Sequence, residues 1–93
     1  MSDSWRILPI ACPPNVTVRG IRFAMQDQGQ LVDVLVTHAA LDRMEPPSVN
    51  GSGYLPRFGK HRESFERFAN DKFVRNAIED DGSIVVLAGD VQA

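Results

Sequence analysis

The pair of residues in this sequence most suggestive of chemistry is His61 followed by Arg62. An imidazole that titrates near pH 6.5 beside a guanidinium fork can bind a phosphate or a carboxylate. Arg62 also stands four residues before Glu66, and one helical turn brings such a pair together. We favour the structural ion pair, because no second anion-binding motif accompanies these residues. Two other acids with which Arg62 can pair are Asp33 and Asp90.

The segment around this pair is rich in cations and offers a second chemistry, contact with nucleic-acid phosphates. Residues 57–75 carry six lysines and arginines against three acids, a local charge of +3. The acids interrupt the cations, whereas phosphate binding strengthens with each cation presented on one face. A solvated helix face with ion pairs such as Glu63–Arg67 is therefore favoured, and a small nucleic-acid-binding regulator is the alternative. The candidate contacts for an anion or a partner are Arg57, Lys60, His61, Arg62, Arg67 and Arg75.

Motifs that carry catalysis or hold a metal are missing from the sequence. The two histidines, His38 and His61, stand in no metal-binding spacing, and Cys12 is the only cysteine. No GxSxG, P-loop or GxGxxG pattern occurs. Asp80 and Asp81 are neighbours in a glycine turn, where carboxyl groups are normally solvated. We therefore predict a protein that is not an enzyme and has no cofactor or metal, and no small-molecule ligand is indicated.

The residues that precede the basic segment predict a β-hairpin. Apolar side chains alternate from Val16 to Met25, with a phase slip at Gly20 that predicts a β-bulge. Residues 27–30 supply a turn, and the β-branched run at 31–36 supplies the second strand.

A short helix is expected after the hairpin. Thr37 is typical of an N-cap, because its hydroxyl accepts a hydrogen bond from an otherwise unpaired N–H group. The helix then covers residues 38–45, and Pro46 and Pro47 end it. Residues 48–53, SVNGSG, have the composition of a loop.

The basic segment itself predicts one long helix from Pro56 to about Glu79. Apolar residues recur along it at intervals of three, four and seven, the pattern of a helix that buries one face. Charged residues such as Arg57 and Glu66 largely fall elsewhere and are expected to be solvated. The apolar stripe consists of Phe58, Phe65, Phe68, Ala69, Phe73, Ala77 and Ile78.

A third strand from Ser83 to Val91 completes the order β-β-α-α-β. We predict an α+β two-layer domain, with a three-stranded antiparallel sheet that carries one short and one long helix on one face. Residues 16–93 form this single domain. Residues 1–15 contain three prolines and are predicted to be an extended, partly mobile arm.

Composition and charge exclude several classes of protein for this chain. With 93 residues, 43% of them hydrophobic, the chain has room for one small folded domain, and its composition is far from that of a disordered protein. The net charge of -2 gives no global attraction to nucleic acid or to an anionic membrane. The N-terminus does not read as a secretory signal, and no run approaches the roughly 20 apolar residues that span a bilayer. With its single cysteine, the chain is expected to be a cytoplasmic protein that does not bind a membrane.

The order of these elements and four of its segments resemble a family of short bacterial proteins, number 1488 in the domain-of-unknown-function series. The resemblance spans about residues 16–91. It implies the fold and assigns no catalytic residue, because the family has none assigned. The four segments are the hairpin, VTHAAL at 36–41, FGKHR at 58–62 and DDGSIVVLAGD at 80–90.

These observations favour a non-enzymatic accessory or protein-interaction module. A three-stranded sheet has two edges with unpaired backbone groups, which favour pairing with a partner's peptide or with a second copy. The exposed face of the long helix is the other expected contact surface. We therefore expect a protein partner or self-association, with nucleic-acid binding by residues 57–75 as the alternative.

Overall fold

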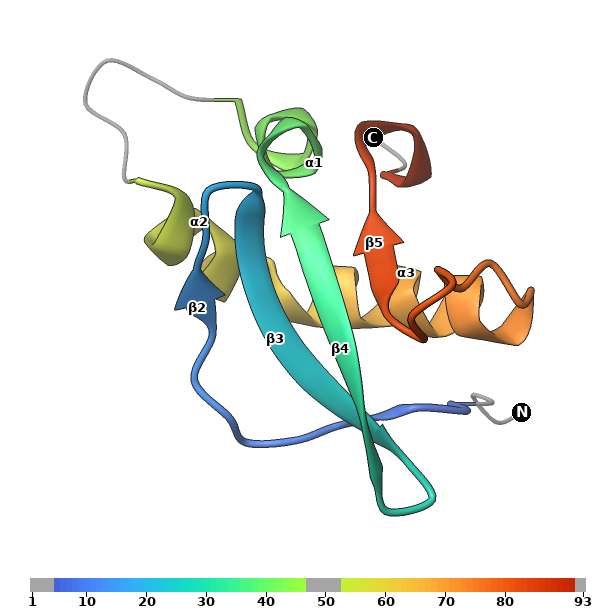
Figure 1. The fold of residues 1–93 in the computed structure, drawn as a ribbon. Coiled ribbons are helices and arrows are strands. Elements are labelled where there is room, and N and C mark those ends of the chain that lie inside the picture. Colours follow the sequence, from blue (N-terminus) through green and yellow to red (C-terminus); the bar gives the residue numbers. More distant parts are fainter. Residues whose placement is uncertain (1–4, 47–52, 92–93) are drawn as a thin grey trace.

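The computed structural model describes residues 5–46 and 53–91, which form one sheet with helices packed against it (Figure 1). The strands are β1 (Leu8–Pro9), β2 (Asn15–Val16), β3 (Gly20–Asp27), β4 (Gln30–Thr37) and β5 (Ile84–Val86). The helices are α1 (His38–Met44), α2 (Tyr54–Lys60), α3 (Arg62–Val74) and the short 3-10 helix η1 (Ala88–Asp90). The predicted α+β class is confirmed.

The central hairpin is confirmed as well. β3 and β4 pair antiparallel along their full length, with Phe23 opposite Val34. Gln28 and Gly29 both have positive φ, which is the conformation of a two-residue turn whose twist matches that of the strands. The alternation of the sequence therefore places the apolar side chains of both strands on one face of the sheet.

The chain before β3 adds two short strands to the sheet. β1 and β2 both pair antiparallel with β3, and Val16 lies opposite Ile21. Thr17 and Gly20 exchange backbone hydrogen bonds, so a tight turn stands where the sequence predicts a β-bulge. The bulge prediction is wrong because the two halves of the alternating pattern belong to different strands. At the tip of this turn, Val18 is 95% exposed.

β5 differs from the predicted third strand in direction and in length. It pairs parallel to β4, with Val85 opposite Leu35. Three helices separate the two strands in the chain, and this long crossover returns β5 to the same end of the sheet. The sheet is therefore mixed rather than antiparallel. Beyond Val86 the chain turns into η1 rather than continuing as a strand.

The short helix α1 begins as the sequence predicts. The Thr37 hydroxyl accepts a hydrogen bond from the Ala40 N–H group at 3.2 Å and so caps the helix. Glu45 follows the last helical residue, and Pro46 comes next. The end predicted at the prolines is confirmed to within one residue. Pro47 and most of the predicted loop at 48–53 lie outside the described residues.

The predicted long helix is two helices. α2 and α3 meet at His61, which has φ -114° and ψ 19° and ends the first helix. α3 then ends at Val74, five residues before the predicted end. Asn76 adopts a left-handed conformation with φ 61°, and the Ala77 N–H group bonds to the Lys72 carbonyl. This is the Schellman arrangement that closes a helix.

The core lies between the sheet and the helices. Phe58 of α2 and Phe65 of α3 are fully buried, and the Phe58 ring packs 5.1 Å from that of Phe23. Phe68 and Phe73 pack partly buried against this core. The expectation that the charged residues of this segment stay solvated is wrong in part, because other elements cover the helices. The buried exceptions are Arg57, Glu66 and Lys72.

Candidate functional site

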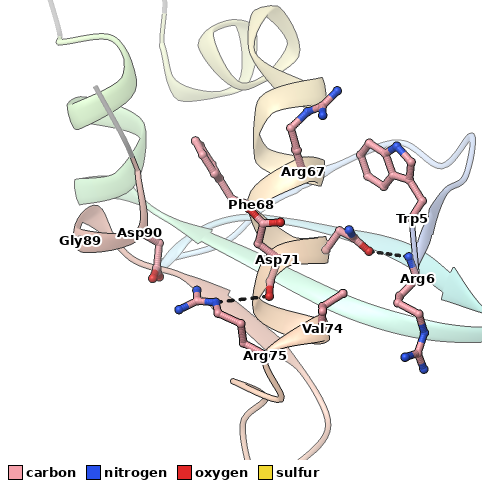
Figure 2. A pocket seen from close by; sticks show the side chains of 10 residues that line it. Trp5, Arg6, Arg67, Phe68, Asp71, Val74, Arg75, Gly89 and Asp90 are labelled. Carbon is pink, nitrogen blue, oxygen red and sulfur yellow. Dashed lines mark hydrogen bonds between the residues drawn. The ribbon is translucent and has the colours of Figure 1, made fainter. Parts of the chain in front are cut away.

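A groove of about 810 Å³ opens along the outward side of α3 (Figure 2). One wall is the N-terminal segment at Trp5 and Arg6, and the opposite wall is the turn at Gly89 and Asp90. We call this feature the α3 groove. The residues that line it are Trp5, Arg6, Arg67, Phe68, Asn70, Asp71, Val74, Arg75, Gly89 and Asp90.

A stripe of three charges runs along the exposed side of α3. Arg67, Asp71 and Arg75 follow one another at intervals of four residues, so they share one side of the helix. A rise of 1.5 Å per residue separates the two arginine positions by about 12 Å. Arg75 donates a hydrogen bond to the backbone carbonyl of Asp71 at 3.4 Å, and so its side chain lies along the helix.

The N-terminal wall is fixed by Asn70. Its Oδ1 accepts hydrogen bonds from the backbone N–H groups of Arg6 at 2.7 Å and Ile7 at 3.1 Å. Ile7 is fully buried, which anchors the segment in the core. The Trp5 ring lies 5.5 Å from the Arg67 guanidinium, a cation–π arrangement that joins wall and helix. The sequence prediction missed this wall, because residues 5–7 and 70 are far apart in the chain.

The opposite wall is held by an ion pair. Lys72 Nζ lies 2.7 Å from Asp90 Oδ2, and the same oxygen accepts a hydrogen bond from the Leu87 N–H group. Burial raises the pKa of Asp90, but the bonds from Lys72 and Leu87 outweigh it and leave the pKa below its ordinary value. Asp90 is therefore ionised at neutral pH and compensated by Lys72. The other charged residues that line the groove are three arginines and Asp71, and one of these arginines, Arg67, also lies 3.9 Å from Glu63, the ion pair that the sequence predicts.

Arg57, the first of the predicted contact residues, is structural. Its side chain is 5% exposed and bonds to Asp42 and to the backbone carbonyl of Glu45. The guanidinium also lies 4.7 Å from the Tyr54 ring. Arg57 therefore joins α2 to α1 and faces away from solvent.

Lys60 and His61 meet at one carboxylate. His61 Nε2 lies 2.7 Å from Glu45 Oε1, and Lys60 Nζ lies 3.4 Å from the same oxygen. These partners, the His61 hydrogen bond first, lower the pKa of Glu45. Together with Arg57 they fasten the end of α1 to the end of α2.

Arg62 forms the predicted ion pair. Its Nε donates to Glu66 Oε2 at 3.1 Å, and its other nitrogens donate to the backbone carbonyls of Ile10 and Cys12. Arg62 therefore ties the N-terminal segment to α3. The other two acids considered as partners are engaged elsewhere, Asp33 with Arg22 and Asp90 with Lys72.

Of the six predicted contact residues, the structure brings only Arg67 and Arg75 into one groove. In residues 5–46 and 53–91, no three His, Cys, Asp or Glu side chains gather where they could hold a metal ion. No helix within the described part of the chain has the length and apolar character needed to cross a membrane.

Comparison with known proteins agrees with this fold. The family model "Protein of unknown function (DUF1488)" matches residues 15–86, and no curated protein matches. A crystal structure of a DUF1488 protein of unknown function from Shewanella loihica PV-4 superimposes with a TM-score of 0.76 at 23% identity. The similarity covers 91% of this chain and 96% of the other. The matched segment contains the strands β2 to β5 and the helices α1 to α3, and the chain belongs to the DUF1488 family.

Proposed function

We propose that this chain is a bacterial cytoplasmic accessory protein, without catalytic activity, that binds an acidic segment of another protein in the α3 groove. The observation that carries the proposal is the excess of positive charge in the groove. Three arginines line it, Arg6, Arg67 and Arg75. Of the two acids that line it, Asp90 is paired with Lys72, and Asp71 is the one that no lysine neutralises. Charge complementarity of this kind directs a partner to a surface and fixes its register.

Apolar surface beside the arginines supports a protein partner. Trp5 and Phe68 are partly buried in the groove, and Val74 is 54% exposed. Aromatic side chains and arginine are the residue types most enriched where proteins bind one another. The arginine stripe favours a segment with acidic groups about 12 Å apart and an apolar side chain between them.

The distribution of the basic residues supports a protein rather than a nucleic acid. Arg57 is buried, and Lys60 and His61 share the Glu45 carboxylate. Arg67 and Arg75 stand on one side of α3 with Asp71 between them, so residues 57–75 offer a phosphate backbone only two cations there. Binding to a phosphate backbone instead needs several unpaired cations on one surface.

The chemistry of the groove supports binding rather than catalysis. Its titratable acids are Asp71 and Asp90, and the second is held by Lys72. His61 lies outside the groove, in the contact between α1 and α2. The cytoplasmic location remains part of the proposal, supported by the single cysteine, Cys12.

Trp5 provides the test, because it is the only tryptophan and lines the groove. The probe is a synthetic helical peptide with glutamates eight residues apart and a leucine between them, compared with the same peptide carrying lysines. We expect the acidic peptide to shift Trp5 emission, with an affinity that falls as salt rises. The lysine peptide should leave the emission unchanged.

Matched variants locate the binding. Each of Arg67→Gln and Arg75→Gln is expected to weaken the acidic peptide about two- to fivefold, the range for an exposed ion pair. Lys60→Gln removes the same charge on α2, outside the groove, and is expected to have no effect. No change in Trp5 emission at millimolar peptide and low salt, or an equal loss in Lys60→Gln, contradicts the proposal.

A further inference from the structure

The face of the sheet opposite the helices has no helix over it in the described part of the chain (Figure 1). The strand register sends the core residues to one face and their neighbours to this open face. Leu31 is 71% exposed there, and Leu8 is 47% exposed. The side chains that the register places on the open face are Leu8, Asn15, Arg22, Ala24, Gln26, Leu31, Asp33, Leu35 and Val85.

A depression of about 350 Å³ deepens this face. Leu35 and Val85, opposite one another on β4 and β5, give it an apolar floor. The turn from β2 to β3 and the residues before β5 line it as well. We call it the sheet trough, and its lining residues are Thr17, Val18, Arg19, Arg22, Asp33, Leu35, Asp81, Ser83 and Val85.

The charges of the sheet trough balance. Arg19 and Arg22 are positive, Asp33 and Asp81 are negative, and Arg22 bonds to Asp33 at 2.9 Å across two strands. Both side chains of that pair are more than half exposed. A surface that carries both charge signs close together can be complementary to a copy of itself, provided that a two-fold axis places unlike charges opposite one another.

Two-fold symmetry allows these balanced charges to form an interface between two copies. When two copies stack face to face, a two-fold axis can lie between the sheets, perpendicular to the line from Arg22 to Asp33. Rotation about it brings Arg22 over the partner's Asp33 and Asp33 over the partner's Arg22. Each single ion pair thereby becomes part of a ring of four alternating charges, and the same residues of both copies form the contact.

We propose that a second copy of this chain covers the open face, with the Arg22–Asp33 pair at the centre and Leu31, Leu35 and Val18 around it. The sheet edges offer a second copy much less surface for contact than the open face does. β1 and β2 contribute two residues each at one side, and β5 contributes three at the other. Such short edges leave few backbone groups for pairing with another strand. The inference does not depend on the α3 groove.

The size of the face sets the expected affinity. The strands hold 23 residues, because only β3 and β4 are eight residues long, and each residue covers about 3.4 by 4.8 Å, so the footprint is about 375 Å². Stable interfaces bury about 800 Å² on each partner. The dimer is therefore weak and concentration-dependent, with a dissociation constant of about 10 μM or above.

Sedimentation equilibrium from about 5 μM to 1 mM tests the interface. We expect the average mass to rise with concentration from the monomer value of 10.3 kDa toward twice that value. Asp33→Arg and Arg22→Asp each place like charges together at two symmetric positions, and each should raise the dissociation constant at least tenfold. The double variant with both changes exchanges the charges and should restore dimerisation to within about threefold.

Asp71→Arg, on the outer side of α3, is the matched control and should leave the dimer unchanged. Circular dichroism on every variant confirms that it is folded. A wild-type protein that stays monomeric at 1 mM overturns the proposal. So does a dimer that both single charge reversals leave intact, because its interface then lies elsewhere. Neither outcome affects peptide binding in the α3 groove, which Trp5 emission reports separately.

Discussion

Lys72 of α3 and Asp90 of η1 form a 2.7 Å ion pair between side chains that are only 10% and 20% exposed. The pair joins the C-terminal turn to the longest helix and holds one wall of the α3 groove. Breaking such a pair leaves a charge with neither water nor a partner around it.

Asp90→Asn is therefore expected to lower the free energy of unfolding by about 2–4 kcal/mol at pH 7, because the largely buried Lys72 ammonium then has no opposite charge beside it. Asp71→Asn changes an exposed carboxylate of the same helix and is expected to cost less than about 0.5 kcal/mol. Urea denaturation of both variants measures the difference. Equal stabilities would show that the pair contributes nothing.

The same pair predicts a dependence on pH. The pKa of Asp90 is lower in the folded protein than in the unfolded chain, so folding favours the ionised form. This contribution is complete above the unfolded value of about 3.9 and is lost as the pH falls through the lower folded value. The stability gap between wild type and Asp90→Asn should therefore narrow between pH 5 and pH 2. A gap that stays constant over this range contradicts the assignment.

Arg57 and Lys60 lie in the same short helix but are expected to respond differently. Arg57→Met removes a buried guanidinium that bonds to Asp42 and the Glu45 carbonyl, and should destabilise the fold by about 2–3 kcal/mol. Lys60→Met changes a side chain that is 67% exposed, and should cost less than about 0.5 kcal/mol. Thermal and urea unfolding distinguish the two. A stable Arg57→Met protein would return this arginine to the candidate binding residues.

Alanine substitutions at Gly20 and Gly59 are expected to change the stability of the fold in opposite directions. At Gly20, φ is +153°, and an added Cβ would overlap the carbonyl oxygen of Val36 and lie 2.9 Å from the Thr37 Cα. Gly20→Ala should cost about 3 kcal/mol or more. Gly59 stands inside α2 with open space around it, so Gly59→Ala should stabilise the fold by about 0.5–1 kcal/mol. Unfolding midpoints of the two variants test both signs.

Nucleic-acid binding by residues 57–75 remains the alternative, and the pairing of its cations predicts a negative result. Fluorescence anisotropy with random-sequence duplex DNA and single-stranded RNA should show no micromolar binding even at about 20 mM salt. Binding that weakens steeply with salt, and is lost in a variant with both Arg67→Gln and Arg75→Gln, would instead favour the regulator.

Features set by neighbouring residues could be predicted from the sequence. The alternation of β3 and β4 predicts their pairing, and the Thr37 hydroxyl predicts the start of α1, because both depend on contacts within a few residues. The sequence also contains a signal for the end of α3. Asn76 is one of the few residue types that readily adopt the left-handed conformation closing a helix, but the apolar stripe beyond it favoured a longer helix.

Features set by distant residues could not be predicted. The break at His61 coincides with its contact to Glu45, a residue of the preceding connection. The parallel direction of β5 depends on the path of three helices. Of the six candidate contacts, the helical pattern alone could not separate Arg57, which α1 covers, from Arg67, which faces the groove. The walls of that groove come from the two ends of the chain, which no local pattern relates.

The hydrogen bonds from Arg6 and Ile7 to Asn70 also constrain the order of folding. The bond to Ile7 spans 63 positions in the chain. During synthesis the ribosome releases Ile7 long before Asn70, whereas β3 and β4 emerge one directly after the other. The hairpin can therefore form while translation continues, but the segment at Arg6 and Ile7, although it is made before the hairpin, reaches its final place only after Asn70 has emerged.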